Sequence, residues 1–179
     1  MHARRRLVRL GICLLLVVGA SAQRKRDPLT PPEIDQLRDT ALEPEQRLKL
    51  YIKFARARLT SLEEKRNDPK TTNRGQQTHD GLEDFLAVYD ELNDNVDMYV
   101  DRKDDIRKPL KAVIEADTEF QAKLRALNNA AGTKPEETKQ YQFVLSNAIE
   151  TLDNSADDHR KLMGEQEEAA KHKKKAKAQ

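Results

Sequence analysis

The chain has 179 residues, of which 36% are charged and only 4% aromatic, and it contains no tryptophan. With 33 basic and 31 acidic residues its formal net charge is +2. The single cysteine excludes a disulfide within the chain and a cysteine-rich metal site. Glycine is scarce, and Ala, Leu, Glu, Lys, Gln and Arg, the strong helix formers, are abundant. The composition therefore favours a helical protein.

Residues 1–22 have the three parts of a secretory signal peptide. A positive region with four arginines precedes a short apolar run at residues 10–18, and Ala20-Ser21-Ala22 is a small-x-small cleavage site. The apolar run is too short to span a bilayer, which needs about 20 apolar residues. We therefore expect cleavage near Ala22-Gln23 and an extracytoplasmic protein, periplasmic or secreted.

The N-terminus has three alternative interpretations: lipidation at Cys13, twin-arginine export, and an uncleaved anchor flanked by residues 24–26. Cys13 lies inside the apolar run and follows the bulky Ile12, where a lipoprotein signal has a small residue. The strongly apolar run is typical of the general secretory route. Cleavage would also remove Cys13, so the mature chain would have no cysteine nucleophile.

Charge is distributed unevenly along the predicted mature chain of 157 residues. The signal peptide carries four arginines and no acid, so residues 23–179 have a net charge of −2. The last nine residues hold five lysines and no acid, so residues 23–170 are at −7; these are Lys171, Lys173, Lys174, Lys175 and Lys177. An acidic body argues against nucleic-acid binding. We expect residues 171–179 to be a disordered Lys-rich tail that serves as a soluble end; the alternative is contact of these lysines with anionic lipid headgroups at a membrane surface or with acidic cell-wall polymers.

The first two helices are predicted on either side of Pro44. Residues 23–29 are expected to form a basic, flexible N-terminus. A short helix then starts at Thr30, because Thr-Pro-Pro-Glu places a capping residue before two prolines and a glutamate. A longer helix is predicted from Pro44 to Arg66, with apolar residues every three or four positions; these are Leu48, Ile52, Ala55, Leu59 and Leu62.

After a polar loop at 67–78, a helix is predicted from Thr78 or His79, with an apolar stripe of Leu82, Phe85, Tyr89, Leu92, Val96 and Tyr99. The stripe resumes after five charged residues, 101–105, as Ile106, Leu110, Val113, Asp117, Phe120, Leu124 and Leu127. Residues 82–127 are either one helix kinked at Pro109 or two helices separated by a turn, with Asp105 as a cap. We favour the turn, because proline costs little in a first helical turn.

The last helix is predicted to begin at Thr133-Lys134-Pro135-Glu136. Its stripe is Tyr141, Leu145, Ala148, Leu152, Ser155, His159 and Leu162. No strand pattern occurs. The sequence therefore predicts an all-α fold in which residues 30–170 form an antiparallel up-and-down bundle of four main, coiled-coil-like helices, with a short extra N-terminal helix.

His159 is the main candidate for a metal ligand, together with Asp153 and Asp157, because imidazole and carboxylate bind zinc or nickel ions. The Glu-x-x-His pattern of bundle metal sites is absent, however. We favour a partly buried, hydrogen-bonded histidine instead. Ser155 lies four residues before His159, but the sequence identifies no third partner for a catalytic triad. No catalytic residue and no cofactor are predicted.

Asp117 occupies an apolar position of its stripe. We expect its carboxylate to reach water at the edge of the seam; the alternatives are a functional acid and a buried polar residue that sets the helix register. Residues 47–58 contain five basic residues and no acid. The next helix and turn carry an acidic row, Glu83, Asp90, Asp94, Asp97, Asp101 and Asp104, and we expect this row to be solvated and to pair with the basic segment.

Residues 29–33 and 59–63 resemble the Leu-Thr-x-x-Gln motifs of small periplasmic helical stress proteins and chaperones. Both end in Glu, they cover ten residues, and helix capping explains the first, so no family is assigned. We expect a non-enzymatic interaction, accessory or chaperone-like factor of the cell envelope, with a protein partner. The alternatives are a bundle that binds a metal or small ligand as a sensor or buffer, and a surface-associated protein that uses its basic segments.

Overall fold

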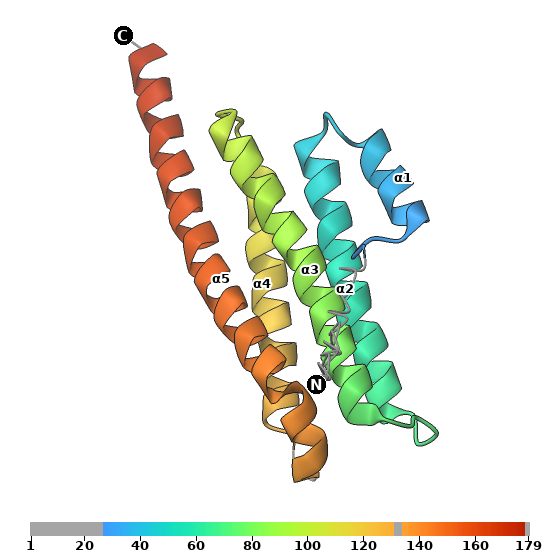
Figure 1. Ribbon diagram of the computed structural model, residues 1–179. Coiled ribbons are helices and arrows are strands. Elements are labelled where there is room, and N and C mark those ends of the chain that lie inside the picture. Colours follow the sequence, from blue (N-terminus) through green and yellow to red (C-terminus); the bar gives the residue numbers. More distant parts are fainter. Residues whose placement is uncertain (1–26, 131–133, 178–179) are drawn as a thin grey trace, which may run out of the picture.

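The computed structural model describes residues 27–130 and 134–177, and this part of the chain is helical with no strand (Figure 1). Its helices are α1 (Pro31–Asp39), α2 (Pro44–Asn67), α3 (Arg74–Asp101), α4 (Arg107–Asn128) and α5 (Pro135–Lys177). The all-α prediction is confirmed. The predicted signal peptide, its cleavage site and Thr133 lie outside the described residues. None of the described helices combines the length and apolar character needed to cross a bilayer.

Helices α2 to α5 form a four-helix bundle in which the direction alternates along the chain (Figure 1). Around the bundle the order of neighbours is α2, α3, α5, α4, so α3 and α4 lie diagonally opposite each other. The neighbours α2 and α3 are antiparallel, as are α4 and α5. Helix α4 separates α3 from α5 in the sequence and runs in the opposite direction, so α3 and α5 are parallel. Because they are also neighbours, their side chains line a common groove.

The core follows the predicted apolar stripes. Leu92, Leu124 and Leu152, each in the middle of a different stripe, are at most 1% exposed. Phe85 and Tyr89 of α3 pack against Phe120 of α4, with ring centroids 5.5 Å and 6.4 Å from the Phe120 ring. Full burial of such side chains contributes about 1.5–3 kcal/mol each. The hydrophobic seam therefore holds the diagonal helices together as well as the neighbours.

The turn predicted between residues 101 and 105 is confirmed. Helix α3 ends at Asp101, α4 begins at Arg107, and Pro109 lies in the first turn of α4. The predicted cap is wrong by one residue, because Ile106 is the N-cap of α4; Asp105, one residue earlier, accepts a hydrogen bond from the backbone N–H of Arg107 at 3.3 Å. Lys103 adopts a left-handed conformation with φ of 62°, which helps the chain to reverse across the end of the bundle.

Helix α3 begins one turn earlier than predicted, at Arg74. The preceding Asn73 has a φ of 51°, a left-handed conformation that asparagine tolerates better than most residues. Gly75 lets the first turn of α3 approach α5 closely. A Cβ atom at this position would lie 2.9 Å from the backbone oxygen of Glu137. The residues of this turn are polar, so the apolar periodicity of the sequence does not reveal that the helix starts here.

Helix α1 is held on the outside of the bundle by α2. The predicted capping box is present, since the backbone N–H of Thr30 donates to Glu33 at 2.8 Å. Leu37 is buried against the core. Arg58 of α2 donates two hydrogen bonds to the carboxylate of Glu33, at 2.9 Å and 2.6 Å. Arg47 of α2 also donates to the backbone oxygen of Leu37 at 2.6 Å, so an apolar residue, an ion pair and this hydrogen bond hold α1 to α2.

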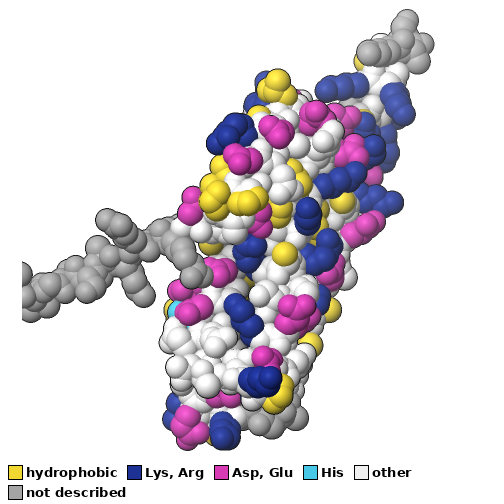
Figure 2. Space-filling view, turned by 90° about the vertical axis from the view of Figure 1, so that its right-hand side faces the viewer, with side chains coloured by type: hydrophobic (Ala, Val, Ile, Leu, Met, Phe, Trp, Pro, Cys, Tyr) yellow, Lys and Arg dark blue, Asp and Glu magenta, His cyan; other side chains and the backbone are white. Residues whose placement is uncertain are grey.

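Helix α5 has 43 residues, almost twice as many as the 22 of α4, and it continues beyond the bundle (Figure 1). Residues 171–177 are helical, where the sequence predicts disorder. Alanine and lysine are both strong helix formers, and lysines near a helix C-terminus interact favourably with its dipole. Residues 171–176 are all exposed. We call residues 167–177 the C-terminal arm; Figure 2 shows basic side chains gathered along this projecting end.

Candidate functional site

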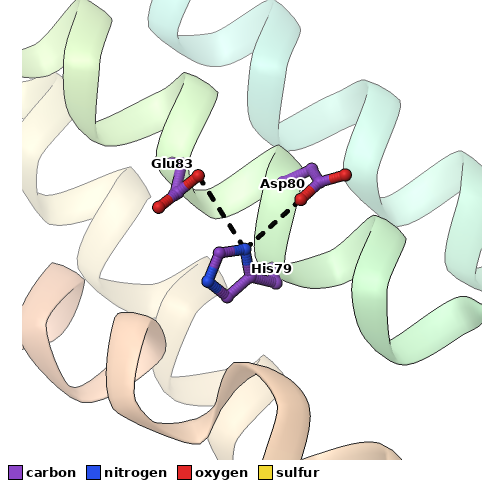
Figure 3. A group of neighbouring side chains, drawn as sticks. All are labelled: His79, Asp80 and Glu83. Atoms are coloured by element: carbon purple, nitrogen blue, oxygen red, sulfur yellow. Dashed lines mark hydrogen bonds and ion pairs between the residues drawn. The ribbon is translucent and has the colours of Figure 1, made fainter. Parts of the chain in front are cut away.

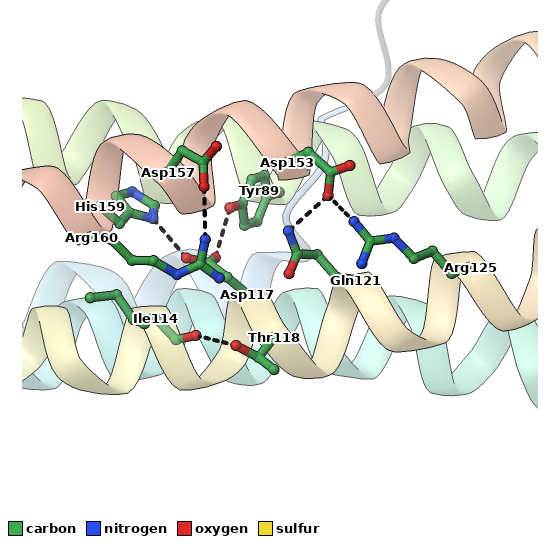
Figure 4. Close-up of polar contacts among 10 residues, drawn as sticks. All are labelled: Tyr89, Ile114, Asp117, Thr118, Gln121, Arg125, Asp153, Asp157, His159 and Arg160. Carbon is green, nitrogen blue, oxygen red and sulfur yellow. Dashed lines mark hydrogen bonds and ion pairs between the residues drawn. The ribbon is translucent and has the colours of Figure 1, made fainter.

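A buried polar network lies in the middle of the bundle, where three helices meet (Figure 4). The hydroxyl of Tyr89 in α3 donates to one oxygen of Asp117 in α4 at 2.7 Å. The other oxygen of Asp117 lies 2.9 Å from Nδ1 of His159 in α5. These three residues form the buried network.

The prediction that Asp117 reaches water at the seam's edge is wrong, because its side chain is 0% exposed. A charge at such a position is tolerated only when it is paired and hydrogen-bonded. Tyr89 supplies its contact from α3, diagonally across the bundle, and His159 supplies the other from the neighbouring α5. Asp117 is therefore a buried polar residue that ties three helices together, one of the alternatives weighed from the sequence.

The hydrogen positions in the network follow from the chemistry of its members. Burial raises the pKa of the Tyr89 hydroxyl, and the nearby charge of Asp117 raises it further, so Tyr89 stays protonated and donates. An ionised carboxylate only accepts hydrogen bonds, so the Nδ1–H of His159 donates to Asp117. In the neutral imidazole this leaves the lone pair on Nε2 as an acceptor. Figure 4 shows that this second ring nitrogen points away from Asp117.

A pocket of about 410 Å³ lies in the groove between α3 and α5, beside the network. His159 is part of its wall, so the buried network connects to the surface at this place. The lining combines polar, acidic and apolar side chains; from α3 come Asn93, Val96, Asp97 and Val100, and from α5 come Ser155, Asp158, His159, Lys161, Leu162 and Glu165. We call it the α3–α5 pocket.

Ser155 and His159 both line this pocket, but they do not act on each other. The hydroxyl of Ser155 accepts a hydrogen bond from Nδ2 of Asn93 at 3.0 Å, and His159 is bonded to Asp117. Among the described hydrogen bonds, none joins the serine to the histidine. A nucleophile needs that contact with its general base. Asp117 is the carboxylate partner of His159, which the sequence did not identify. Because Ser155 is not hydrogen-bonded to His159, the three residues do not form a catalytic triad.

The three candidate metal ligands have separate partners (Figure 4). Asp153 accepts from Gln121 and Arg125, both at 2.7 Å, and Asp157 pairs with Arg160 at 2.9 Å. His159 is a buried, hydrogen-bonded histidine, the interpretation favoured from the sequence. The bundle therefore places these three side chains in three different sets of contacts.

Within the described chain, one group of three potential metal ligands converges, namely His79, Asp80 and Glu83 on α3 (Figure 3). Their ligand atoms lie within 4.8 Å of one another. Nδ1 of His79 is 3.3 Å from Asp80 and 3.8 Å from Glu83. The two carboxylates are more than half exposed. Residues three and four positions apart are neighbours on a helix, and Glu83 follows Asp80 and His79 at these distances, so the sequence alone could have indicated this group. All three side chains come from one turn of one helix at the surface.

The basic segment 47–58 is engaged within the molecule, as expected, but by other partners than predicted. Arg56 forms three hydrogen bonds with Glu119 of α4, and Arg58 pairs with Glu33 of α1. Arg47 donates to Oδ1 of Asn95 at 2.7 Å, an amide of α3. The two arginines thus find their carboxylates on α4 and α1, because those helices flank the outer sides of α2.

Comparisons with known proteins place no relative beside this fold and site: no family model, no curated protein and no solved structure matches the chain.

Proposed function

We propose that this protein is an exported, non-enzymatic interaction protein of the cell envelope, and that its C-terminal arm contacts an anionic membrane surface. The observation that carries the proposal is the projection of α5 beyond the bundle with residues 171–176 exposed. Five lysines and no acid occupy residues 171–179. Lys173 and Lys174 line a surface pocket with the α3–α4 turn, but the exposed residues 171–176 build no core, so their charge is available for contact with something outside the bundle.

The charge distribution supports the same direction of contact. The body, residues 23–170, has a net charge of −7, whereas the arm is basic at its end. Near an anionic surface, the body is repelled and the lysines are attracted. The molecule therefore orients with the arm towards the surface and the bundle away from it. Each lysine near such a surface contributes about 1 kcal/mol.

The base of the arm is fixed to the bundle by Gln166. Its Oε1 accepts from the backbone N–H of Ile106 at 3.1 Å, and its Nε2 donates to the backbone oxygen of Asp104 at 3.2 Å. Both contacts are with the turn between α3 and α4. The lysines are thus carried on a supported helix, which costs less ordering entropy on binding than a disordered tail.

Vesicle sedimentation tests the proposal with the triple variant Lys173→Gln, Lys174→Gln and Lys175→Gln, because glutamine keeps the helix and removes the charge. We expect binding to vesicles with about 30% anionic lipid to fall by at least about 100-fold, from about 1 kcal/mol per lysine. The matched control removes three exposed body lysines, Lys70, Lys111 and Lys139, and should change binding little. Equal losses in both variants would reduce the effect to net charge and overturn the role of the arm.

Deletion of residues 171–179 gives a second test. It should remove most of the vesicle binding, and raising the salt to about 0.15 M, where the Debye length is about 8 Å, should weaken what remains. The melting temperature should barely change, because the deleted lysines bury no apolar surface. Strong vesicle binding after the deletion would transfer the contact to another basic segment and contradict the proposal.

A further inference from the structure

The α3–α5 pocket is lined by a buried hydrogen-bond acceptor that lacks a donor. Oδ1 of Asn93 is buried and has no hydrogen-bond partner, while the Nδ2 group of the same amide is used by Ser155. His159 is 4% exposed, and its Nδ1 is used by Asp117, which leaves Nε2 for the pocket. A buried acceptor without a donor is destabilising. Oδ1 of Asn93 therefore calls for a donor from a molecule that enters the pocket, and His159 lines the same pocket with its second ring nitrogen.

Three carboxylates surround these acceptors, from Asp97, Asp158 and Glu165. Within the described residues, none of the three forms an ion pair or a side-chain hydrogen bond, although arginines and lysines pair with many other acids of the bundle. The pocket's own cation is Lys161, whose side chain is exposed. The lining therefore has an excess of negative charge and of acceptors, which excludes an anion and favours a cation rich in N–H donors.

The parallel register of α3 and α5 sets the shape of the ligand. Asn93 contacts Ser155, and Asp104 contacts Gln166, so the two helices keep a constant offset of 62 residues along the groove. At this register Val100 lies level with Leu162, between the polar level of His159 and the acid Glu165. His159 and Glu165 are about 9 Å apart along the helix axis at 1.5 Å per residue. An apolar stretch thus separates two polar ends.

The geometry points to an aliphatic diamine or polyamine as the ligand of the α3–α5 pocket. One ammonium group donates to acceptors at the polar end of the pocket, where Asn93, His159 and Asp158 form the wall. The methylene chain lies on Val96, Val100 and Leu162, and a second ammonium group reaches Glu165. The volume of about 410 Å³ accommodates such a chain.

A metal ion fits this pocket less well than an amine. A metal needs several ligand atoms converging on one point, and the convergent group in the described chain is on α3 at His79, away from this pocket. An amine with two charged ends instead uses acceptors that are spread along the groove. The separation of the polar ends therefore distinguishes the two kinds of cation.

Calorimetric titration of the purified protein with 1,5-diaminopentane tests the inference, and 1-aminopentane serves as the matched ligand with one ammonium group. We expect saturable one-to-one binding of the diamine and at least about tenfold weaker binding of the monoamine, since one charge-assisted contact is lost. Nitrogen NMR of the histidines should show a shift at Nε2 of His159, with little change at His79 and His172. No saturable heat would mean that water fills the pocket, and would overturn the inference.

The protein variants separate the pocket from general acidity. Asp158→Asn with Glu165→Gln should weaken diamine binding by at least about tenfold, because both carboxylates are at the pocket. Both residues are exposed, so the variant is expected to fold. The matched control, Asp94→Asn with Asp101→Asn, removes the same charge from exposed positions outside the pocket. Equal losses in both variants, or displacement of the diamine by an equal concentration of Mg²⁺, would contradict the inference.

Discussion

Glu33 and Asp117 are both acids held inside the molecule, but they are held in different ways. Glu33 is 9% exposed and accepts hydrogen bonds from Arg58 and from its own helix cap, within a peripheral helix that packs on α2. Asp117 is 0% exposed and joins three helices of the bundle through Tyr89 and His159. Glu33 attaches one peripheral helix, whereas Asp117 connects three helices in the core of the bundle. Local and global stability should therefore respond separately to changes at the two sites.

The largest effect is expected from Asp117→Ala. This change leaves the Tyr89 hydroxyl and the His159 imidazole buried without their acceptor, and breaking a buried pair in this way costs about 3–5 kcal/mol. Urea denaturation should show the loss as a lower midpoint of one cooperative transition. Asp117→Asn keeps an acceptor oxygen in the same place and should cost less. A loss below about 1 kcal/mol for the alanine variant would mean that the carboxylate is solvated.

Two leucines extend the comparison to apolar contacts. Leu152→Ala should destabilise the bundle by about 2–5 kcal/mol, because the side chain is fully buried among the core helices. Leu37→Ala, at a position of α1 that is 4% exposed, should mainly loosen α1. Global unfolding followed by hydrogen exchange distinguishes the two outcomes. Equal global losses would show that α1 is an integral part of the cooperative unit.

A smaller, local effect is expected from Glu33→Gln. Glutamine retains the size of the side chain and can still accept from the cap, but it lacks the charge that pairs with Arg58. We expect a loss of about 1–2 kcal/mol, seen as faster hydrogen exchange in α1 with unchanged exchange in α3 to α5. Asp39→Asn, at an exposed position of the same helix, is the control and should have no effect. Faster exchange throughout the bundle would refute the local role.

The smallest effect is a pH dependence of the α1 attachment. Burial alone would raise the pKa of Glu33, but hydrogen bonds from Arg58 and Thr30 outweigh it and hold the pKa below its ordinary value. The carboxylate therefore stabilises the docked α1 above the ordinary glutamate pKa of about 4.3, and this contribution is lost as the pH falls below it. Hydrogen exchange of α1 should speed up in that range. In Glu33→Gln the same range should have no added effect, which separates Glu33 from the other acids.

The sequence predicts features that depend on neighbours along the chain. The capping box at Thr30 and Glu33 lies within four residues, and the proline in the first turn of α4 is a local signal as well. The apolar stripes predict which faces are buried, because a helix needs only its own periodicity to define a face. Leu92, Leu124 and Leu152 follow from this rule.

The features that were missed depend on contacts far along the chain. The sequence does not reveal the burial of Asp117, because its partner His159 is 42 residues later in the chain. The partners of the basic segment on α4 and α1 depend on which helices flank α2, and periodicity does not give the order of helices. The sequence does not predict the α3–α5 pocket for the same reason. Its lining residues on α3 and α5 are about 62 residues apart in the chain, and they become neighbours only because the α3–α4 turn connects diagonally opposite helices.

That diagonal crossing also has a consequence for the order of folding. The hairpin of α2 and α3 closes a short loop, whereas the parallel pairing of α3 with α5 closes a longer loop that contains the whole of α4. The entropic cost of closing a loop grows with its length, and non-local contacts form late. We therefore expect the contacts between α3 and α5 to form last, and substitutions in them to accelerate unfolding while leaving the folding rate almost unchanged. The lifetime of the native state then depends mainly on how firmly α5 is held against α3.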